Sequence, residues 1–161
     1  MVYRSGDPWS VLGWIGVRNP VRLGSMAASL YIVVEGEDPG FDIFVNGHAL
    51  ARNEDALERL AERLKVYPLL EFFSADENSM ALLLEQGAGK PEWARHLPEP
   101  QWFGPSTGLV TVRALLRFLE GSPMALGSET ASVISELREY ERVLRKTEEH
   151  GLRWHLAVSW R

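Results

Sequence analysis

Residues 152–161 read Leu-Arg-Trp-His-Leu-Ala-Val-Ser-Trp-Arg and form the most regular pattern in the chain. Every second residue of this stretch is a large apolar one: Leu152, Trp154, Leu156, Val158 and Trp160. A period of two is typical of a β-strand that has one face against a core and one polar face. We therefore expect a last strand that lies within or beside a sheet, with both Trp side chains on the core face.

The two segments before this strand have the period of helices. Ser128 is expected to cap a helix that runs to about Glu149 and ends at Gly151 in the C′ position. A second helix is expected over residues 106–120, capped by Ser106 or Thr107. Each has an apolar stripe at helical spacing, Val133, Leu137, Tyr140 and Leu144 in the first, and Leu109, Val112, Leu116 and Leu119 in the second.

A third helix is expected nearer the start of the chain. Asn53 is a suitable N-cap, and Glu54 and Asp55 follow it in the first turn, where the positive end of the helix dipole favours acidic residues. The apolar side chains then recur at intervals of three and four: Leu57, Leu60, Ala61 and Leu64. This spacing predicts a helix over residues 53–64 with one buried face.

The remaining apolar runs predict further strands. Residues 30–34 are β-branched and aromatic, and residues 41–45 alternate before Asn46-Gly47, a pair that suits the type I′ turn of a hairpin into residues 48–51. Residues 66–73 read as a strand that Pro68 restricts to a sheet edge, and residues 80–85 fit either a strand or a helix. We therefore expect an α+β fold with a mostly antiparallel sheet of about four or five strands and about three helices packed on one face.

The first 25 residues differ from the rest. They contain two Trp, four Gly and two Pro without a sustained period, and their charge is +2. Two interpretations are open: either Met26 is the biological start, or an irregular arm docks Trp9 and Trp14 on the domain. We favour the first, with residues 1–25 as an irregular segment outside the native domain and residues 26–161 as a single α+β domain.

Composition and charge exclude several classes of function. The chain has no Cys, which excludes thiolate catalysis and indicates a reducing, cytoplasmic setting. Residues 26–161 hold 14 basic and 21 acidic residues, a net charge of −7 within a chain of −5, which argues against nucleic acid as a partner. No run approaches the roughly 18 apolar residues of a membrane span. No metal site and no cofactor are expected from the spacing of the histidines and acids.

Two arrangements of residues could support hydrolysis. Residues 104–108, Gly-Pro-Ser-Thr-Gly, have the spacing of a nucleophile elbow around Ser106, but no strand precedes it, and helix capping by Ser106 or Thr107 is the better explanation. A carboxylate and a histidine, such as Asp42 with His48, are the other arrangement. A small hydrolase built on either is therefore the alternative function.

The long connection over residues 87–105 is the strongest candidate for binding. Four prolines stiffen it around its aromatic side chains and one histidine: Trp93, His96, Trp102 and Phe103. Rigid aromatic residues are frequent in recognition loops, although the same side chains could pin a crossover to the core. From this loop, the acidic charge and the classes already excluded, we expect a non-catalytic cytoplasmic binding domain that interacts with a protein partner, as an inhibitor or immunity-like protein does.

Overall fold

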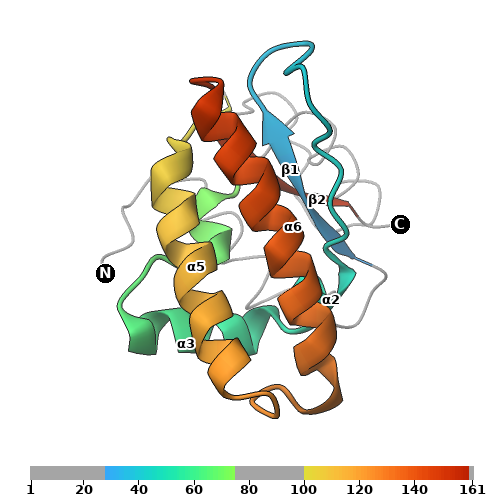
Figure 1. Ribbon diagram of the computed structural model, residues 1–161, viewed down its shortest axis with the longest axis vertical. Helices are drawn as coiled ribbons and strands as arrows, with labels where there is room; N and C mark the ends of the chain where they lie inside the picture. The colour runs from blue at the N-terminus through green and yellow to red at the C-terminus, as the bar shows by residue number, and fades with distance from the viewer. Residues whose placement is uncertain (1–27, 75–99, 160–161) are drawn as a thin grey trace, which may run out of the picture.

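The sheet is formed by two strands that are far apart in the sequence. In the computed structural model, which describes residues 28–74 and 100–159, β1 (Ser29–Val34) pairs antiparallel with β2 (Trp154–Ser159) (Figure 1). The register places Leu30 opposite Val158 and Ile32 opposite Leu156. The inward side chains of β1 are buried and alternate with half-buried ones, so the expectation of a strand over residues 30–34 is confirmed.

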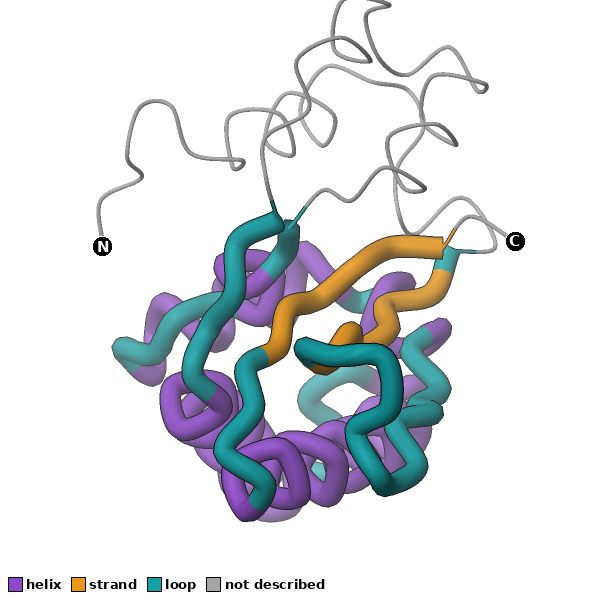
Figure 2. Tube along the Cα trace, turned by 90° about the horizontal axis from the view of Figure 1, so that it is seen from above, coloured by secondary structure: helices purple, strands orange, loops and turns teal. Residues whose placement is uncertain are grey.

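Four α-helices accompany this pair of strands within the described ranges. They are α2 (His48–Arg52), α3 (Glu54–Leu64), α5 (Pro105–Gly121) and α6 (Thr130–Glu149), and two short 3-10 turns, η2 (Leu69–Phe72) and η4 (Gly127–Glu129), complete the fold. The long helices α5 and α6 run side by side (Figure 1). Behind their lower parts in this view, α3 crosses α5 and α2 lies against α6. Seen from above, helices lie around the two strands on several sides (Figure 2).

The apolar stripes that the sequence predicts make up the core. All four stripe residues of α6 and all four of α5 are buried, and β2 packs Trp154 between the helices and Phe72. Gly108 makes this packing possible, because a Cβ at that position would lie 2.3 Å from Cζ2 of Trp154. The three predicted long helices are therefore confirmed, together with the final strand as far as Ser159. Its expected polar face is wrong, because His155 and Ala157 are buried as well.

The predicted sheet of four or five strands is wrong: the described part of the chain holds a sheet of only two. The expected hairpin over residues 41–51 is a loop followed by α2. A type I′ turn needs positive φ at both central residues, yet Gly47 has a φ of −129° and Asn46 is not among the residues with positive φ. The alternation of residues 41–46 still decides which side chains face the core.

The expected strand over residues 66–73 is also wrong. After Pro68 the chain turns through η2, and only Phe73 forms a bridge to the sheet, with Leu156 of β2. Phe103 forms an antiparallel bridge with Trp154, so β2 has backbone partners along both edges without a third strand in the part of the chain that the structure describes. Residues 80–85 lie outside the described residues.

The predicted helix boundaries hold better than the predicted caps. Gly104 and Pro105 begin α5, so Ser106 and Thr107 lie inside the helix and neither caps it. At α6 the hydroxyl of Thr130 accepts a hydrogen bond from the Leu126 N–H at 2.9 Å, and Ser128 is part of η4. At the other end Gly151 has a φ of 65° just after the helix, as its C′ position requires.

Candidate functional site

Two of the four predicted binding residues can be located. Trp93 and His96 lie outside the described residues. The Phe103 N–H donates to the Trp154 carbonyl at 2.8 Å, and its ring meets that of Phe72 edge-on at 5.5 Å. The half-buried Trp102 lies with its ring centroid 4.8 Å from that of the buried His155. Both aromatic residues thus contact the core beside β2, and their role in binding stays a prediction.

The candidate nucleophile Ser106 is exposed in the first turn of α5. Within the described ranges no side-chain hydrogen bond joins it to a histidine. His150 instead places Nδ1 2.8 Å from the Lys146 carbonyl oxygen, and its ring lies against Phe41. Without a base in hydrogen-bond contact, nothing in this geometry activates the Ser106 hydroxyl.

Asp42 and His48 each have a different partner. Asp42 Oδ1 accepts the N–H of Phe44 at 2.9 Å, and His48 Nδ1 lies 3.1 Å from the Ala28 carbonyl oxygen. The carboxylate whose pKa His48 affects is that of Glu136, which it lowers. The structure therefore does not assemble the predicted pair.

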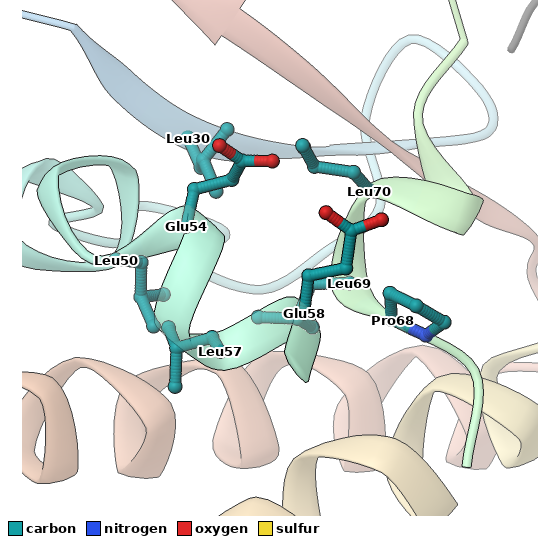
Figure 3. Close-up of a pocket in the computed structure, with 8 residues that line it drawn as sticks. All are labelled: Leu30, Leu50, Glu54, Leu57, Glu58, Pro68, Leu69 and Leu70. Carbon is teal, nitrogen blue, oxygen red and sulfur yellow. The ribbon is translucent and has the colours of Figure 1, made fainter. Parts of the chain in front are cut away.

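A small pocket lies between α3, α2, β1 and η2 (Figure 3). It encloses about 250 Å³, open solvent at its mouth included, which is below the usual size of a small-molecule site. Figure 3 shows Glu54 and Glu58 extending from α3 toward Leu30 and Leu70. The remaining lining residues are apolar: Leu50, Leu57, Pro68 and Leu69.

Glu54 is the most perturbed carboxyl group around this pocket. Its pKa is raised to about 8, chiefly by burial and also by the charge of Asp55, a hydrogen bond with Asp55 and the charge of Glu58. Oxygens of the three carboxyl groups lie within 4.8 Å of one another, close enough to share one cation. Acids also gather in the first turn of helices without any metal, because the free N–H groups there favour negative charge. A proton held by Glu54 accounts for the cluster, and we assign no metal to it.

A second feature is the loop between β1 and α2, where Phe44 is 72% exposed. Both backbone groups of Phe44 are held: its N–H donates to Asp42 Oδ1, and its carbonyl accepts from Nη2 of Arg142 at 3.2 Å. Nη1 of Arg142 also donates to the Asp42 carbonyl at 3.1 Å. The loop therefore presents a large apolar side chain to solvent on a fixed backbone.

Helix α6 fixes the rest of this loop with a row of polar side chains. Glu139 accepts the Asn46 N–H at 3.1 Å, and the Tyr140 hydroxyl donates to the Leu30 carbonyl. Glu136 accepts the N–H groups of Ala49 and Leu50, the first of them at 3.1 Å and the second at 2.9 Å. Side chains from one helix thus hold the second half of the connection from β1 to α2 and the start of α2.

The exposure of Phe44 can be predicted from the sequence pattern of residues 41–46, although that pattern by itself suggests a hairpin. In the alternation of residues 41–46, Phe44 is the apolar residue on the side of Asp42 and Asn46, and those two are exposed as well. Phe41, Ile43 and Val45, on the other side, are half-buried or buried. A large aromatic residue at a polar position of an alternating pattern therefore marks an exposed apolar side chain.

Comparisons with models of protein families, with curated proteins and with solved structures gave no match. Among residues 28–74 and 100–159, no helix has the length and hydrophobicity needed to cross a bilayer. What can be inferred about function therefore comes from the geometry of the described residues.

Proposed function

We propose that this chain is a non-catalytic, cytoplasmic protein-interaction domain and that Phe44 anchors its partner. It would act as a stoichiometric partner, as an inhibitor or immunity-like protein does. The observation that carries the proposal is the exposed Phe44 ring on a backbone that Asp42 and Arg142 hold from both sides. Aromatic side chains that enter a pocket of the partner supply much of the binding energy at such interfaces.

Fixing the backbone before binding supports this role energetically. A mobile loop loses conformational freedom when a partner binds, and that loss reduces the affinity. The hydrogen bonds from α6 order residues 42–50 in the free chain already. Burial of the Phe44 ring in a partner can then contribute to affinity with little further ordering of this loop.

The charge around Phe44 suggests the chemistry of the partner. Residues 35–42 contain four acidic residues and no basic one. Glu35 is paired with Arg153, and Arg142 lies beside Phe44, but Glu37, Asp38 and Asp42 are exposed in the same loop. An apolar pocket rimmed by Lys and Arg would complement this surface, and opposite charge would also speed association. The partner we propose is therefore a protein with a basic rim around an apolar pocket.

The aromatic residues of the 87–105 connection form a second proposed contact. Trp102 is half-buried, and Trp93 and His96 belong to the same connection in the sequence. We assign the primary role to Phe44, because both of its backbone groups have partners.

A photocrosslinking experiment tests the proposal. Phe44 is replaced by the photoreactive analogue p-benzoylphenylalanine, the chain is irradiated in the cytoplasm of its native cells, and adducts are identified by mass spectrometry. Met124 is the matched control, since it is 76% exposed in the turn between α5 and α6. We expect one dominant adduct at position 44, with a protein that has a basic, apolar surface, and none of it at position 124. The same adducts at both positions, or none at position 44, would contradict the proposal.

A further inference from the structure

The N-terminus of α2 is capped by a residue of another helix. Gly47 occupies the N-cap position and has no side chain with which to cap. A larger residue does not fit there, because a Cβ on Gly47 would lie 1.8 Å from the Leu30 carbonyl oxygen. The cap comes from α6 instead, where the Glu136 carboxylate accepts the N–H groups of Ala49 and Leu50.

We propose that Glu136 is an acid-sensitive latch, so that protonation of its carboxylate releases the start of α2 from α6. The latch is intramolecular and does not depend on the proposed function. Its consequence for binding does rest on that function, since residues 41–47, with Phe44, lead directly into α2.

The chemistry of the carboxyl group supports this role. Ionised, the two oxygens accept one N–H each, as the distances of 2.9 Å and 3.1 Å show. A neutral acid keeps one good acceptor, and its O–H oxygen accepts weakly, so at least one backbone N–H loses its partner. Glu136 is only 7% exposed, and water has little room to replace the lost bond.

The surroundings of Glu136 set the direction of its response to pH. Burial raises its pKa, while the hydrogen bonds from Leu50 and Ala49 and the charges of Arg52 and His48 lower it, with burial the larger effect. The carboxyl group therefore takes up a proton at a higher pH than an ordinary glutamate.

Charged groups from each neighbouring element belong to this balance. On α2, Arg52 is paired with Glu129 at 2.8 Å, which reduces its hold on Glu136, and His48 favours the ionised carboxylate when it is protonated. On α6 itself, Glu139 and Tyr140 are the nearby titratable groups. Because the charge of Arg52 is already paired with that of Glu129, it stabilises the ionised Glu136 carboxylate less, and mild acid can protonate Glu136 more readily.

Amide hydrogen exchange on the free full-length chain tests the latch. Protection factors of the Ala49 and Leu50 amides are measured by NMR from pH 7 to pH 4, with the core amide of Leu116 in α5 as reference. We expect protection of at least one of the two amides to fall roughly tenfold, the effect of losing about one hydrogen bond, while the reference stays constant. An unchanged ratio to the reference across this range would overturn the proposal.

Two variants and a direct titration complete the experiment. Glu136→Gln, which keeps one good acceptor oxygen, should have low protection at one or both amides at every pH, whereas Glu148→Gln, an exposed site on the same helix, should keep the response of the native chain. The side-chain carboxyl 13C shift of Glu136 in the native chain should titrate at a higher pH than that of a glutamate in an unstructured peptide, and this measurement remains decisive if Glu136→Gln does not fold. A pH response that survives in Glu136→Gln, or a Glu136 midpoint at or below that of the peptide, would contradict the proposal. No partner is needed, so a failed latch leaves the proposed role of Phe44 untouched.

Discussion

The guanidinium of Arg142 on α6 donates a hydrogen bond to the carbonyl oxygen of Phe44 at 3.2 Å, although the two residues are 98 positions apart. A second bond from the same side chain reaches the Asp42 carbonyl. The side chain of Arg142 therefore holds the loop around Asp42 and Phe44 against α6. Its removal should change the order of the loop more than the stability of the domain.

For Arg142→Ala we expect a loss of unfolding free energy of about 1 kcal/mol or less, because both hydrogen bonds are exposed to solvent. The backbone order parameter of Phe44 should fall clearly below the value typical of rigid backbone. Urea unfolding and 15N relaxation measure the two effects. Arg145→Ala is the matched control, an exposed arginine on the same helix. Equal order at Phe44 in both variants would show that Arg142 does not hold the loop.

Phe44 and Phe72 should respond in opposite ways to truncation. Phe44→Ala should change the unfolding free energy by no more than about 0.5 kcal/mol, as surface substitutions usually do. Phe72 is 2% exposed and stacks on Trp154 with centroids 5.0 Å apart, so Phe72→Ala should cost about 3–5 kcal/mol. Chemical denaturation of both variants gives the comparison. A large loss in Phe44→Ala would make Phe44 a structural residue and remove the basis for its role as an anchor.

Local patterns predict the long helices of this fold, whereas the sheet depends on contacts that no local pattern contains. The stripes of α5 and α6 have a 3.6-residue period, and their burial follows from it directly. Helix α2 instead takes its cap from Glu136, which is 86 positions from Leu50 in the sequence. Phe72 stacks on Trp154 from a 3-10 turn, without the ladder that the composition of residues 66–73 suggests.

The same distinction explains the candidate sites. Trp102 and Phe103 were identified by composition, which cannot distinguish a core contact from a surface contact. Phe44 lies on the side of its loop that the alternation predicts, but the bonds from Arg142 that fix it come from the far end of the chain. The exposure of the Phe44 side chain can therefore be predicted from the sequence, whereas the fixed conformation of its backbone cannot.

Gly108 and Gly121 offer a test of the packing on Trp154. A Cβ on Gly108 would lie 2.3 Å from the buried indole, so Gly108→Ala should destabilise the domain by about 1–3 kcal/mol or more through overpacking. Gly121 has no atom within 4 Å of such a Cβ, and Gly121→Ala at the end of the same helix should be neutral or slightly stabilising. Thermal melts of both variants measure the difference. Comparable melting temperatures would mean that Trp154 does not pack against Gly108.

Glu54 should make the stability of the domain depend on pH in an unusual direction. Its pKa is 4.5 in an ordinary setting and about 8 in the fold, chiefly through burial, so the folded state holds on to the proton more strongly than the unfolded state. The stabilisation from this group is complete below about pH 4.5 and is lost as the pH rises through about 8. Glu54→Gln stays neutral, and it should be more stable than the native chain at pH 8, with the difference shrinking toward pH 5. Urea unfolding at several pH values measures it, and Glu62→Gln, an exposed site on the same helix, is the control. If Glu54→Gln and Glu62→Gln change stability alike at every pH, the proton on Glu54 has no part in holding α3 against β1 and η2.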